Sequence, residues 1–108
     1  MAEYKFQVNL KPKEAFDIIK NNHTASLIYE DYKNVSHDKE IGVLVYEKYY
    51  IRNSSRAALT VIIDNIDGAT QVASVSTGSS QSMIFKFDWG ASDEFASSIQ
   101  RMLADYII

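Results

Sequence analysis

The sequence predicts a single α+β domain, in which an antiparallel sheet has one helix near each end of the chain and both helices on one face. The chain has 108 residues, which suits one hydrophobic core and is too short for a second. Several segments alternate apolar and polar residues with the period of two that is typical of half-buried strands. Two other segments, one near each end, have apolar residues at helical spacing.

The N-terminal part of the chain is predicted to form a strand followed by a helix. Residues 4–10 alternate apolar and polar side chains, which indicates a strand with one buried face. Pro12 ends this strand and suits the first position of a helix. Because an apolar stripe then continues as far as Asn21 and Asn22, the helix is expected over about residues 12–22.

The middle of the chain is predicted to add four more strands. Residues 27–32 and 43–50 favour extended structure, and the polar residues 33–40 between them are expected to form a loop. A turn at residues 52–55 then leads to a strand that lines one face with Ala57, Leu59, Val61 and Ile63. A further turn at residues 65–68 precedes a shorter strand of small residues, Val72, Ala73 and Val75.

The C-terminal part is predicted to contain a loop, an extended segment and the second helix. Residues 76–82 are expected to form the loop, and residues 83–89 alternate like a sixth strand or an extended lead into the helix. Ser92 is the expected N-cap. The helix stripe Phe95, Ile99, Met102, Leu103 and Tyr106 should form the main core against the sheet residues Phe6, Val8, Leu59, Val61 and Ile63.

This order predicts one domain over residues 1–108, with neighbouring strands joined as antiparallel hairpins. The same topology occurs in the helix-grip domains, of which Bet v 1 and START proteins are examples, and in the TATA-binding-protein fold. Both comparisons concern topology alone, because a fold does not imply a function.

Composition excludes several classes of protein. No cysteine is present, so disulfides, thiolate zinc sites and cysteine nucleophiles are excluded, and a cytoplasmic location is expected. No secretory signal and no apolar run of roughly 18 residues is found, so membrane insertion is not expected. The net charge is −3 and the eleven Lys and Arg residues are scattered, which disfavours binding to nucleic acid.

Two segments give the chain a resemblance to a known family. They are Thr77-Gly78-Ser79-Ser80-Gln81-Ser82-Met83-Ile84-Phe85-Lys86 and Val45-Tyr46-Glu47-Lys48-Tyr49. In these segments the chain resembles DUF6054, a family of small bacterial proteins known only as a domain of unknown function. The resemblance covers most of the chain. It implies a compact bacterial domain and no catalytic residues.

The leading hypothesis from the sequence is a non-enzymatic module that binds a small-molecule or lipid-like ligand, apolar or polar. One candidate site is the polar run Thr77, Gly78, Ser79, Ser80 and Gln81, where backbone amides and hydroxyls could hold a phosphate or a polar head group. The alternative for this run is a solvated connection, since it lacks the lysine of a Walker motif. The other candidate site is a cavity under the last helix, lined by Phe95 and Met102.

No catalytic residue, metal or other cofactor is predicted. His23 and His37 have carboxylates nearby in sequence, but neither has a partner at ligand spacing. Ser79 and Ser80 lack a nucleophile elbow and an identifiable base. Asp64 and Asp67 fit the chemistry of a turn better than that of an acid–base pair.

An alternative function rests on the tyrosines of the expected strands. Five of the seven, Tyr29, Tyr32, Tyr46, Tyr49 and Tyr50, lie in the segments 27–32 and 43–50. Because alternate residues face opposite sides of a sheet, some must lie on the outer face, where they could bind a protein partner or a second copy of the chain. The simpler explanation is that tyrosine favours strands. The alternative is therefore a structural or regulatory protein that acts through homodimerisation or partner binding.

Overall fold

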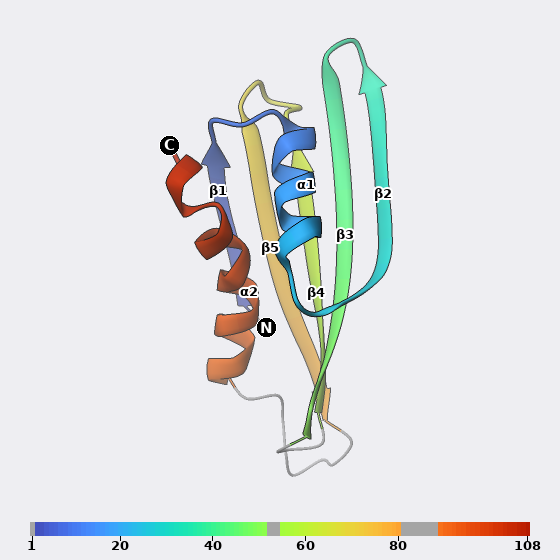
Figure 1. Ribbon diagram of the computed structural model, residues 1–108, viewed down its shortest axis with the longest axis vertical. Helices are drawn as coiled ribbons and strands as arrows, with labels where there is room; N and C mark the ends of the chain where they lie inside the picture. The colour runs from blue at the N-terminus through green and yellow to red at the C-terminus, as the bar shows by residue number, and fades with distance from the viewer. Residues whose placement is uncertain (1, 52–54, 81–88) are drawn as a thin grey trace.

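A computed structural model of the chain describes residues 2–51, 55–80 and 89–108, which form an α+β domain with one antiparallel sheet (Figure 1). The elements in chain order are β1 (Ala2–Val8), α1 (Pro12–Asn22), β2 (Ser26–Ser36), β3 (Lys39–Tyr50), β4 (Ser55–Asp64), β5 (Thr70–Ser80), α2 (Trp89–Met102) and the short 3-10 helix η2 (Ala104–Tyr106). The five strands are ordered β1-β5-β4-β3-β2. The predicted fold class, an antiparallel sheet with two helices, is thus confirmed.

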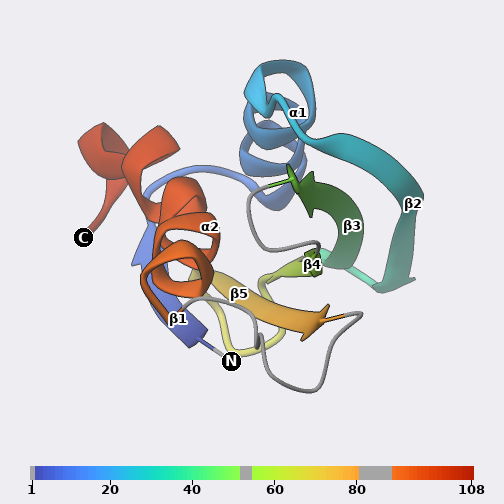
Figure 2. The same cartoon turned by 90° about the horizontal axis from the view of Figure 1, so that it is seen from below.

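Both helices lie on the same face of the twisted sheet (Figure 2). Helix α1 contacts β3 and β4, and α2 contacts β1, β5 and β4. Pairing between β1 and β5 brings the N-terminal strand beside the last strand. The two helices contact each other, because α1 covers the β3 and β4 side of the sheet and α2 covers the neighbouring β5 and β1 side.

The core lies between this sheet face and the helices. Alternate residues of each strand point to the helices, so the sheet residues predicted for the core, Phe6, Val8, Leu59, Val61 and Ile63, are buried. Phe95, Ile99 and Leu103 are buried against them, as predicted, but Met102 is only partly buried. Tyr106 is 37% exposed, so its predicted place in the core is wrong. The helix ends at Met102 and continues as η2, and the spacing of an α-helix no longer applies there.

The loop predicted over residues 33–40 is wrong, because β2 and β3 form a long hairpin with a tight turn. Strand β2 continues to Ser36, and β3 begins at Lys39. Asp38 in the turn has a φ of 61°, a left-handed conformation that aspartate tolerates better than most residues. The residues are polar because β2 is an edge strand of the sheet and most of its side chains are exposed.

The loop predicted over residues 76–82 is also wrong in its first part, since β5 extends to Ser80. Ser74 and Ser76 are buried on the helix side of this strand. The Ser74 hydroxyl donates a hydrogen bond of 2.8 Å to the backbone carbonyl of Ala96 in α2. A serine is suited to this position because it is small enough for the helix to approach and its hydroxyl is satisfied there.

Helix α2 begins earlier than the sequence indicated. Its first residue is Trp89, so Ser92 lies inside the helix and the predicted N-cap is wrong. The remainder of the predicted sixth strand, residues 83–88, lies outside the described residues. Neither of the helices in the described ranges has the length and apolar character needed to cross a membrane.

Candidate functional site

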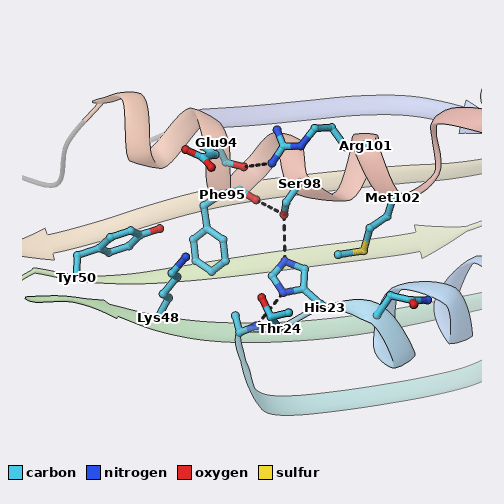
Figure 3. Close-up of a pocket in the computed structure, with 11 residues that line it drawn as sticks. His23, Thr24, Lys48, Tyr50, Glu94, Phe95, Ser98, Arg101 and Met102 are labelled. Carbon is cyan, nitrogen blue, oxygen red and sulfur yellow. Dashed lines mark hydrogen bonds between the residues drawn. The ribbon is translucent and has the colours of Figure 1, made fainter.

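A cleft of about 300 Å³ opens between the end of α1, the strand β3 and the helix α2 (Figure 3). We call it the helix cleft. Its polar lining includes His23, Lys48, Glu94, Ser98 and Arg101, and its apolar lining includes Tyr50, Phe95 and Met102.

Local structure explains why these side chains meet. Helix α1 ends at Asn22, and His23 has an extended backbone with φ −76° and ψ 136°, which turns the chain toward β2. Lys48 lies two residues after the buried Tyr46 in β3, so both side chains point to the same face of the sheet. Lys48 is near the end of the strand. On α2 the lining residues lie at intervals of three or four, so they share one side of the helix.

A chain of hydrogen bonds through His23 connects the two helices. The backbone N–H of Ala25 donates to His23 Nδ1 at 3.1 Å, and His23 Nε2 lies 3.0 Å from Ser98 Oγ. Since Nδ1 accepts a hydrogen bond, the neutral ring has its proton on Nε2 and donates it to Ser98. The Ser98 hydroxyl in turn donates to the carbonyl of Phe95 at 2.6 Å.

The imidazole of His23 is half-buried between aromatic rings. It stacks on Tyr46, with ring centroids 4.5 Å apart and an interplanar angle of 26°, and its centroid is 5.9 Å from that of Phe95. Burial lowers the pKa of His23, and the positive charge of Lys48 lowers it further. His23 is therefore neutral at pH 7, in agreement with its hydrogen bonds.

The His23–Ser98 pair resembles half of a hydrolase triad, but its hydrogen bonds have the wrong direction for that chemistry. A general base must offer a lone pair to the serine hydroxyl. Here Nε2 donates to Ser98, and the hydroxyl proton is directed to the Phe95 carbonyl. In this arrangement the pair fixes α2 against the end of α1, and it does not activate a nucleophile.

We expect acidification to weaken the fold through His23. A folded-state pKa below the unfolded value of about 6.5 means that the folded state binds fewer protons, so the stability is complete above that pH and is lost as the pH falls below it. Urea titrations at about pH 7.5 and about pH 5 should show a larger loss of unfolding free energy in the wild type than in His23→Gln. The matched control is His37→Gln in the exposed β2–β3 turn, which should keep the wild-type loss. An equal loss in all three proteins would contradict the assignment.

Cationic side chains approach the helix cleft from two walls. Lys48 comes from β3, and its ammonium lies 5.2 Å from the centroid of the Tyr50 ring. Arg101 comes from α2, where Nη1 donates to Ser97 Oγ at 2.7 Å and Nη2 to the Glu94 carbonyl at 3.3 Å. These bonds hold the guanidinium at the rim of the cleft, and the exposed carboxylate of Glu94 lies on the same helix (Figure 3).

The structure divides the residues that the sequence proposed as a ligand site. Phe95 and Met102 both line the helix cleft. Thr77 and Gly78 lie elsewhere, in a shallow depression of about 240 Å³ beside Glu47 and Arg56. The last two residues of β5 are Ser79 and Ser80, and Gln81 lies outside the described residues.

The residues considered for a metal do not come together in the described part of the chain. His37 lies exposed in the β2–β3 turn, 3.2 Å from a carboxylate oxygen of Asp38, whereas His23 precedes the other end of β2. Within residues 2–51, 55–80 and 89–108, no group of three or more His, Cys, Asp or Glu side chains could hold a metal ion.

Comparisons with known proteins give a family and no function. A model described as "Family of unknown function (DUF6054)" matches residues 1–107. This match confirms the resemblance that the segments 45–49 and 77–86 indicated. No curated protein and no solved structure matches the chain significantly.

Proposed function

The chain belongs to the DUF6054 family, whose function is unknown, and we propose that it is a non-enzymatic module that binds a small anionic molecule in the helix cleft. The observation behind this proposal is that Lys48 and Arg101 approach from different walls a cleft that Phe95 and Met102 also line. Such a cleft suits a ligand with an acidic group at one end and an apolar body at the other.

The size and charge of the helix cleft narrow the ligand class. A volume of about 300 Å³ is at the lower end of the range of ligand sites, so a small molecule fits better than a long lipid chain. Among the described residues that line the cleft, two cations, Lys48 and Arg101, face one carboxylate, that of Glu94, and this net charge of +1 favours a ligand with one negative group. That group can also accept hydrogen bonds from either cation, and these are stronger than bonds between neutral groups.

We also propose that the fold is of the helix-grip or TATA-binding-protein-like type. The element order β-α-β-β-β-β-α and the pairing of β1 with β5 support this proposal. A ligand site between sheet and helices is consistent with either type of fold.

We expect Lys48→Ala and Arg101→Ala each to weaken binding of a small carboxylate by about 5- to 20-fold, because each removes a charge-assisted hydrogen bond. The ligands would be a panel of aliphatic and aromatic monocarboxylates and monophosphates, tested by amide chemical-shift perturbation and then by calorimetry. Lys13→Ala is the matched control, since Lys13 lies exposed on α1 in an ion pair with Asp17. Shifts that avoid His23, Ser98 and Arg101, or variants that bind like the control, would contradict the proposal.

A further inference from the structure

The face of the sheet opposite the helices has an apolar centre, and one row of residues across it carries opposite charges at the two edges of the sheet. One row crosses all five strands in register, and in order from β2 to β1 it consists of Asp31, Val43, Ile62, Ala73 and Lys5. Its middle residue, Ile62, is 37% exposed although it belongs to the central strand. The row thus ends in an acid at the β2 edge and in a base at the β1 edge.

The next row has a similar centre but different ends, a tyrosine at the β2 edge and an acid at the β1 edge. It consists of Tyr29, Val45, Thr60, Val75 and Glu3, again from β2 to β1. We define the outer-face patch as the central residues of both rows, Val43, Val45, Thr60, Ile62, Ala73 and Val75. Both described helices lie on the other side of the sheet (Figure 2). The patch ends at Asp64, whose carboxylate accepts a hydrogen bond from the Ile66 backbone.

We propose that a second copy of this chain packs on the outer-face patch, with the two-fold axis parallel to β4. This rotation places the β2 edge of one copy over the β1 edge of the other. Ile62 then meets its own copy, Val43 meets Ala73, and Asp31 meets Lys5. A large side chain faces a small one, and an acid faces a base, as in a self-complementary interface.

The charges distinguish this axis from its alternative. A two-fold axis perpendicular to the strands through Ile62 would place Asp31 over Asp31 and Lys5 over Lys5, and like charges at an interface are unfavourable. Within one chain, Asp31 forms an exposed ion pair with Lys33 at 3.5 Å, and Lys5 forms one with Glu3 at 3.9 Å. Both remain accessible to a partner.

The area of the face suits a dimer. Five strands about 4.8 Å apart span about 24 Å, and the two rows together with the flanking rows through Ala58 and Asp64 of β4 span about 27 Å. Each copy would therefore cover about 650 Å² and the pair about 1,300 Å², which is within the range of specific interfaces. Because the helix cleft lies on the opposite face, it stays open in this dimer, and the dimer does not depend on the proposed ligand site.

The first test is the oligomeric state of the full chain by sedimentation equilibrium. We expect a dimer in the wild type and at least a tenfold weaker dimer in Ile62→Lys, because two lysines would meet at the axis. Ile66→Lys is the matched control, since Ile66 is 45% exposed but lies in the β4–β5 turn, outside the patch. A wild-type monomer at high micromolar concentration, or a dimer unchanged by Ile62→Lys, would overturn the proposal.

Charge exchange tests the axis. Asp31→Lys and Lys5→Asp should each weaken the dimer by roughly 5- to 30-fold, because each places like charges opposite at two symmetric positions. The double variant should recover most of the wild-type affinity. If the double variant is as weak as the singles, the proposed axis is wrong.

Discussion

Phe95→Ala is expected to lower the free energy of unfolding by about 3–5 kcal/mol, whereas Met102→Ala should lower it by only about 1 kcal/mol. Phe95 is 4% exposed and packs in the core beneath α2, so its truncation leaves a cavity. Met102 is partly buried at the helix cleft, where solvent can fill the space that its side chain leaves. Leu103→Ala, at a fully buried position one residue later, should resemble Phe95→Ala.

Denaturant titration of the three variants measures these differences in the free energy of unfolding. Met102 serves as the internal comparison, because it lies on the same helix as Phe95 and lines the same cleft. Three equally large losses would mean that the cleft is closed in solution, and the ligand proposal would lose its site. Three small losses would mean that α2 does not pack on the sheet as the structure shows.

The sequence predicted the helices and most strands because their burial follows a regular period. Alternation placed Phe6, Val8, Leu59, Val61 and Ile63 on the buried face of the sheet, and all five are buried. The prediction failed where polar residues form strands without a regular alternation of apolar and polar side chains. Residues 33–40 around the β2–β3 turn are polar because most of them are exposed, and β5 contains serines because α2 lies close to that strand. Composition alone does not separate either case from a loop.

The candidate site was predictable only in part. Phe95 and Met102 could be proposed because they belong to one helical stripe, and both line the helix cleft. The His23–Ser98 pair joins residues 75 positions apart, and no local pattern connects them. The available signal was the position of His23 directly after a predicted helix end, where a side chain often satisfies nearby backbone groups.

Gly42 shows how closely α1 approaches the sheet. A Cβ atom at this position would lie 2.6 Å from Cδ2 of Phe16 and 2.9 Å from Cδ2 of Tyr32. These two rings pack edge to face, with centroids 5.0 Å apart, and Lys13 lies above both at 4.9 and 5.0 Å. A glycine inside a strand often marks such a close approach. The missing side chain therefore makes room for the contact between α1 and β3.

Gly42→Val is accordingly expected to destabilise the domain by about 3 kcal/mol or more, because Phe16 is buried and cannot move aside without disturbing the core. Phe16→Ala alone should cost about 3–5 kcal/mol through the cavity that it leaves. In the double variant the new valine occupies part of that cavity, so the combined loss should be smaller than the sum by about 1–3 kcal/mol. Ala58→Val is the control, since Ala58 borders the shallow depression on β4, where added methyl groups have space. Urea titration of the four variants gives the coupling energy, and strictly additive losses would show that Gly42 and Phe16 are not in contact.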